Sequence, residues 1–75
     1  MNDLNQINAA NQASVEHAAI KAARAAGKFV VAKYDGLHLV GHVPADSRED
    51  AETQIAALNE VRGFSERLKL LAPTA

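Results

Sequence analysis

Apolar positions gather most densely in the stretch KFVVAKYDGLHLVGH, residues 28–42, which consists of two apolar runs joined by Asp35-Gly36. Asp-Gly between two such runs is a strong signal for a two-residue type I′ turn, because both central residues of that turn need a positive φ. The pattern therefore predicts an antiparallel β-hairpin with strands at about 28–34 and 37–43.

Two registers of this hairpin are open. In the two-residue turn, which we favour, Tyr34 faces Leu37 and Ala32 faces Leu39; a three-residue turn with Gly36 in a bulge shifts the partners by one and exchanges the faces. Both faces of the hairpin are apolar in either register. An isolated two-stranded sheet is marginal in water, so the hairpin needs other elements to cover it.

The segment before the hairpin is rich in alanine and ends at Gly27, which predicts a helix at about 13–26. Its small inward face is expected to carry Val15, Ala19 and Ala22. Asparagine recurs in the first dozen residues and competes with the helix through its own side-chain hydrogen bonds. We therefore expect residues 1–12 to form a frayed segment.

A second helix is predicted at about 47–62, after the hairpin. Its start has two possible caps, either Asp46 with Glu49 or Ser47 with Asp50, and acidic residues in the first turn suit the helix dipole. The apolar stripe of this helix faces the hairpin.

A short terminal helix is predicted at about 65–72, where ERLKLL follows Ser65. Together the elements indicate one small α+β domain over residues 13–75, with the order α-β-β-α and the hairpin packed by both helices.

The second strand of the hairpin, LHLVGHV, has no Lys or Arg to protect a free sheet edge. We expect it to pair with its own copy, giving a four-stranded sheet across a homodimer. A strand from another protein is one alternative, and cover by the C-terminal segment 64–72 is the other. The predicted self-association edge consists of Leu37, Leu39, Val40 and Val43.

Composition limits the possible classes of function. The chain has 75 residues, no cysteine, a formal net charge of −1 and a sequence pI near 6.3. It has no basic and apolar leader and no apolar run long enough to span a bilayer, so we expect a soluble, cytoplasmic protein without membrane contact. A dedicated nucleic-acid-binding domain is usually clearly basic, although a local basic patch is compatible with these values.

No motif for catalysis, metal binding or nucleotide binding stands out. His38 and His42 lie about 13 Å apart along a strand, too far to share a metal ion, and His17 has no helical partner. The segment AAGKF lacks the spacing of a phosphate-binding loop. We expect no enzyme activity, no cofactor, no metal and no small-molecule substrate.

The charges are segregated along the chain. Residues 17–34 hold four Lys or Arg and no acid, whereas residues 46–60 hold five acids and one Arg. The two blocks could neutralise each other or dock partners of opposite charge. The predicted partner-binding faces are a basic one, His17, Lys21, Arg24 and Lys28, and an acidic one, Glu49, Glu52 and Glu60.

These observations favour a small non-enzymatic protein–protein interaction module, expected to be a homodimer. By class alone, such chains are common among inhibitors and adaptors of phages and other mobile elements, which occlude a host protein surface. A nucleic-acid-binding regulator that uses the basic face as a dimer is the second hypothesis, and a structural subunit of a larger assembly is the third.

Overall fold

The computed structural model describes the backbone of residues 2–75 and the side chains of residues 14–75. It has mixed α+β architecture, as the sequence predicts, but the predicted order omitted a third strand. The elements follow the order α1 (Asn2–Ala25), β1 (Phe29–Asp35), β2 (His38–Ala45), α2 (Arg48–Val61) and β3 (Glu66–Leu71).

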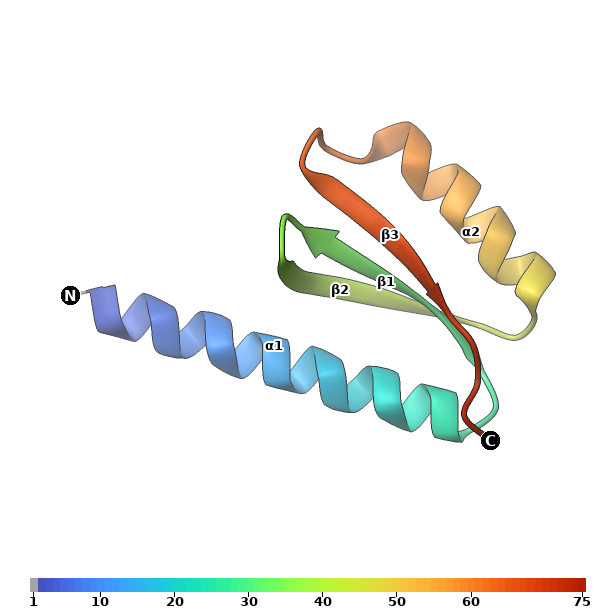
Figure 1. Ribbon diagram of the computed structural model, residues 1–75, viewed down its shortest axis with the longest axis horizontal. Coiled ribbons are helices and arrows are strands. Elements are labelled where there is room, and N and C mark those ends of the chain that lie inside the picture. Colours follow the sequence, from blue (N-terminus) through green and yellow to red (C-terminus); the bar gives the residue numbers. More distant parts are fainter. Residues whose placement is uncertain (1) are drawn as a thin grey trace.

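The three strands form one antiparallel sheet with the order β2-β1-β3, so β1 is central. The two helices cover opposite faces of this sheet, and the N-terminal half of α1 extends beyond it (Figure 1). The Cα atoms span 44 × 29 × 12 Å. The domain is thus a thin three-layer structure lengthened by α1.

Each face of the sheet has its own apolar cluster, because alternate residues of β1 point to opposite faces. The cluster beneath α1 is built on the buried residues Ile20, Val30, Ala32 and Leu39. The cluster beneath α2 is built on Val31, Ala45 and Ala51 and on the half-buried side chains of Phe29, Val43, Ile55, Leu58, Leu68 and Leu70.

Helix α1 ends where the sequence predicts. Gly27 has a φ of 88°, and the N–H groups of Gly27 and Lys28 donate to the carbonyls of Arg24 and Ala23, each at 3.1 Å, which is a Schellman motif. The predicted start near residue 13 was wrong, because the helix begins at Asn2. That segment 1–12 frays stays a prediction, and its side chains lie outside the described residues.

The predicted inward face of α1 was wrong at Val15 and Ala22, whereas Ala19 is half-buried. Ile20 is buried and Ala23 packs beside it, whereas Val15 is 66 % exposed and Ala22 is exposed. The helix is rotated so that its largest described apolar side chain, Ile20, meets the sheet.

The hairpin has a turn that neither predicted register describes. Asp35 pairs with His38, so the two central residues are Gly36 and Leu37. Gly36 has a φ of 64° and no non-glycine residue in the described chain has a positive φ, which fits a type II′ turn with glycine first. Leu37 is therefore not a core residue and is 96 % exposed.

A β-bulge further changes the faces of β2. Tyr34 pairs with Leu39 and Lys33 with Gly41, which leaves Val40 as the extra residue. The bulge reverses the alternation, so Leu39 faces α1 while Val43 faces α2. Regular alternation in the hairpin favoured from the sequence would have put Leu39 and Val43 on one face, and the bulge separates them.

Helix α2 agrees with the predicted range within one residue at each end. Of the two possible caps the structure has Ser47, whose hydroxyl accepts a hydrogen bond of 3.1 Å from the Asp50 N–H. The carboxylate of Asp50 in turn accepts from the Asp46 N–H at 3.3 Å. These contacts satisfy N–H groups at the start of the helix and fix the exit from β2.

The predicted terminal helix at 65–72 was wrong, because residues 66–71 form β3 and pair with the free edge of β1. Leu68 and Leu70 reach the α2 cluster, while Arg67 and Lys69, which alternate with them, are exposed. The backbone of this short strand pairs with the free edge of β1, and its alternate side chains add two leucines to the α2 cluster.

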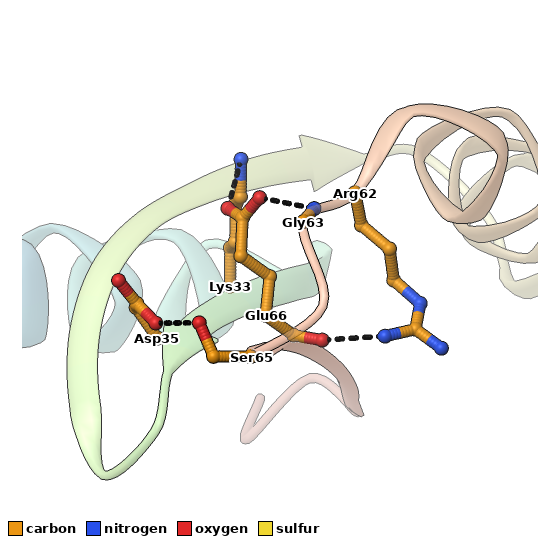
Figure 2. Close-up of polar contacts among 6 residues, drawn as sticks. All are labelled: Lys33, Asp35, Arg62, Gly63, Ser65 and Glu66. Atoms are coloured by element: carbon orange, nitrogen blue, oxygen red, sulfur yellow. Dashed lines mark hydrogen bonds and ion pairs between the residues drawn. The ribbon is translucent and has the colours of Figure 1, made fainter.

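Polar contacts tie the start of β3 to the hairpin (Figure 2). The Ser65 hydroxyl donates to the Asp35 carboxylate at 2.5 Å, and the Gly36 N–H donates to the Ser65 carbonyl at 3.0 Å. The Glu66 carboxylate accepts from the Lys33 ammonium at 2.6 Å and from the Gly63 N–H at 2.5 Å. The turn before β3 is thus fixed against the tip of the hairpin.

We expect the stability of the fold to decrease in acid, and Glu66→Gln to weaken this dependence. The hydrogen bond from Lys33, followed by that from the Gly63 N–H, lowers the pKa of Glu66. A carboxyl whose pKa is lowered by folding contributes stability above its unfolded pKa, and that contribution is lost as the pH falls through the folded value. Thermal unfolding between about pH 7 and about pH 3 measures the effect.

The matched control is Glu52→Gln, which removes an exposed carboxyl of α2 instead. It should retain the acid dependence of the original protein. An acid slope that is the same in Glu66→Gln and Glu52→Gln would contradict the role given to the Glu66 contacts.

Candidate anion-binding groove between α1 and β3

Helix α1 lies off-centre on its face of the sheet, over β2 and β1, and leaves the β3 side of that face open. An open groove of about 410 Å³ follows the uncovered side. Its floor includes Ile20 and the half-buried side chains of Tyr34 and Leu71, which all belong to the apolar cluster beneath α1. The groove is therefore a feature of the packed sheet and not of a loop.

One wall of the groove is the flank of α1, with His17, Lys21 and Arg24. These residues are three or four positions apart, so they follow one another along the same side of the helix. The described side chains of α1 include one carboxylate, Glu16, and it turns to the opposite flank, where it contacts His42 of β2 at 2.5 Å. The groove side of α1 is thus cationic.

The other wall is β3. Arg67 and Lys69 alternate with Leu68 and Leu70, which belong to the α2 cluster, so the two cations start from the α1 face of the strand. Lys69 lies opposite Ala32. Arg67 lies opposite Tyr34 at the free edge of the sheet, and it lines a second groove, beneath α2.

The C-terminal residues close one end of the groove. The Arg24 Nε donates to the Ala72 carbonyl at 2.6 Å, and the Thr74 N–H donates to the Arg24 carbonyl at 3.0 Å. Thr74 is itself a lining residue. Arg24 keeps further N–H donors on its guanidinium, because Nε carries only one of the five.

The charge of this surface is uniform. Two cations of α1 line the groove, no carboxylate is among its lining residues, and strand alternation places two more cations on the same face of β3 beside it. Such an arrangement raises the local potential and attracts anions even though the whole chain has a net charge of −1. The cations are Lys21, Arg24, Arg67 and Lys69.

The structure gathers three of the four residues of the predicted basic face. His17, Lys21 and Arg24 line the groove, whereas Lys28 lies outside it and forms an ion pair of 2.5 Å with Asp46. This hydrogen bond lowers the pKa of Asp46. The basic and acidic blocks of the sequence therefore meet at this contact, where Lys28 and Asp46 neutralise each other.

The predicted acidic face lies elsewhere. Glu49, Glu52 and Glu60 are exposed on α2, on the other side of the sheet from the groove. The two charged surfaces thus belong to opposite layers of the domain. The carboxylates of α2 therefore do not neutralise the cations of the groove.

The predicted self-association edge does not form one surface. Leu39 is buried, Leu37 occupies the turn, Val40 lies in the bulge and is 40 % exposed, and Val43 packs toward α2.

Sequence reasoning missed Arg67 and Lys69. The signal that could have found them is the alternation of charged and apolar residues in ERLKLL, which is typical of a half-buried strand. The predicted terminal helix gave no reason to place these two cations on the same face of the sheet as α1.

Among residues 14–75, no three His, Asp or Glu side chains are grouped as metal ligands would be. In the described part of the chain, no helix combines the length and apolar character needed to cross a membrane. Comparison of this chain with protein-family models, with curated proteins and with solved structures finds no match.

Proposed function

We propose that this protein is a small non-enzymatic binding module that docks an anionic polymer in the groove between α1 and β3. The observation that carries the proposal is an open groove lined by two cations of α1 and by no carboxylate, with two further cations of β3 on the same face of the sheet. The fold holds both walls in place, because α1 and β3 pack on the same central strand. Binding therefore needs little rearrangement of the chain.

The groove suits a polymer better than a small anion. It is open, its floor is partly apolar, and the cations of α1 and of β3 flank it on two sides. A small anion would meet only one or two of these cations, and exposed charge pairs are individually weak. An extended polyanion can contact all four and gains from the release of its counterions.

The self-association proposed from the sequence is not part of this function. The edge of β2 is interrupted by the bulge at Val40 and by Pro44, and both features disfavour pairing with a further strand. The module can act as a single chain, since all four cations of the groove belong to one copy. A role as a phage inhibitor or adaptor stays a prediction from class alone.

Heparin, a flexible sulfated polyanion, is the direct probe of this function. We expect binding at low salt that weakens with a slope of log K against log salt near −3, because about four cations take part. Lys69→Gln should weaken binding about threefold to tenfold. Titration by isothermal calorimetry at several salt concentrations measures both effects.

Lys28→Gln is the matched control, because it removes the same charge outside the groove. It should change heparin affinity less than twofold. Absence of heparin binding at low salt would overturn the proposed function, and so would equal losses in Lys28→Gln and Lys69→Gln.

A further inference from the structure

Tyr34 adds an aromatic ring to the floor of the groove, which the charged residues do not provide. It is the only tyrosine of the chain, which has no tryptophan, and it is the one aromatic residue among the lining residues. The side chain packs against the apolar cluster beneath α1 and also borders the groove. An aromatic ring is therefore held on the central strand while part of it stays accessible.

The cations stand on both sides of this ring. Tyr34 lies on β1, between the α1 wall and Arg67, its direct partner on β3. Lys21 and Arg24 are about 4.5 Å apart along the helix axis, and Arg67 and Lys69 are about 7 Å apart along the strand. A chain that runs through the groove would meet cations at regular intervals on either side of an aromatic floor.

An aromatic floor between cationic walls matches the chemistry of single-stranded nucleic acid. Its phosphates need cations spaced along a groove, and its unpaired bases expose faces that stack on aromatic side chains. In a duplex the base faces are already stacked on one another, so they cannot reach a ring at the bottom of a groove. An acidic peptide would use the cations but has no group that requires the ring.

The closed end of the groove sets the length of the site. The contacts of Arg24 with Ala72 and Thr74 block passage at that end, while the end near the hairpin tip has no such contact in the described chain. The site is thus short, comparable with the smallest single-strand sites of about four nucleotides.

We propose that the anionic polymer is single-stranded nucleic acid, held by its phosphates on Lys21, Arg24, Arg67 and Lys69 with one base stacked on Tyr34. This inference rests on the proposed function, because it assigns the ligand of the same groove.

The test compares four probes of similar charge by the intrinsic fluorescence of Tyr34 and by calorimetry. The probes are an oligothymidylate of about eight nucleotides, the same backbone without bases, a DNA duplex and polyglutamate. We expect the single strand to bind about tenfold more tightly than the abasic strand and to quench Tyr34 fluorescence, whereas the abasic strand, the duplex and polyglutamate leave the fluorescence unchanged.

Variants of Tyr34 provide a second, independent readout. Tyr34→Leu should lose about tenfold in affinity for oligothymidylate and keep its affinity for the abasic strand, and Tyr34→Phe should keep both. If Tyr34→Leu does not fold, the comparison of probes on the original protein still decides. Equal affinities for the single and abasic strands, with unchanged fluorescence, would overturn this inference and leave the proposed function standing. Failure of every probe to bind, heparin included, would overturn both.

Discussion

Val31→Asp is expected to unfold the domain. Val31 lies on the central strand, is 1 % exposed and forms the centre of the cluster beneath α2 with Ala45 and Ala51. A carboxylate at this position would be desolvated, and the substitution would also remove apolar packing, which together cost more than about 4 kcal/mol. This is a large fraction of the stability of a small domain, which is typically about 5–15 kcal/mol.

Far-UV circular dichroism and thermal melting measure this effect. Val40→Asp is the control, because it makes the same substitution on a strand of the same sheet where the side chain is 40 % exposed and lies in the bulge. It should lower the stability by about 1 kcal/mol or less. A cooperative melt in Val31→Asp close to that of the original protein would mean that the two-sided core described above is wrong.

Lys21→Glu combined with Lys69→Glu is expected to abolish polyanion binding, with a loss of about a hundredfold or more at low salt. The pair takes one cation from each wall of the groove and replaces both with carboxylates, so the local charge changes from attractive to repulsive. Both residues are exposed and neither forms an ion pair within residues 14–75, so the fold should tolerate the change. Heparin titration measures the loss.

The control for this reversal is Lys28→Glu with Arg48→Glu. It makes the same change in net charge at exposed positions that do not line the groove. If this control loses as much affinity as the groove variant, binding depends on net charge and the groove has no special role.

The sequence predicted the hairpin but not its register, because the pair Asp35-Gly36 is compatible with more than one type of turn. A type I′ turn needs a positive φ at two residues, whereas the turn observed needs it only at Gly36 and accepts Leu37 as the second residue. The local signal for the bulge at Val40 is the neighbouring Gly41, because an isolated glycine inside a strand often marks a bulge, but it does not show how the faces change. That change follows from tertiary packing, because Leu39 and Val43 must reach clusters on opposite faces of the sheet.

The third strand was missed because short apolar segments are ambiguous. In ERLKLL, Leu68, Leu70 and Leu71 fit both a helical turn and an alternating strand. The free edge of β1 decides between the two, and that edge is known only once the hairpin has been placed. The half of the candidate site on α1 could therefore be predicted from periodicity, whereas the half on β3 required the sheet order.

The position of β3 in the chain also bears on how the protein reaches its native state. The hairpin joins neighbouring residues and can form within about 1–10 μs, but β3 closes on β1 through contacts such as Ser65 with Asp35, which are 30 residues apart. Until that closure, the outer edge of β1 is unpaired and the cluster beneath α2 lacks Leu68 and Leu70. We therefore expect β3 to dock after the hairpin has formed, and the chain to be most prone to aggregation before that step.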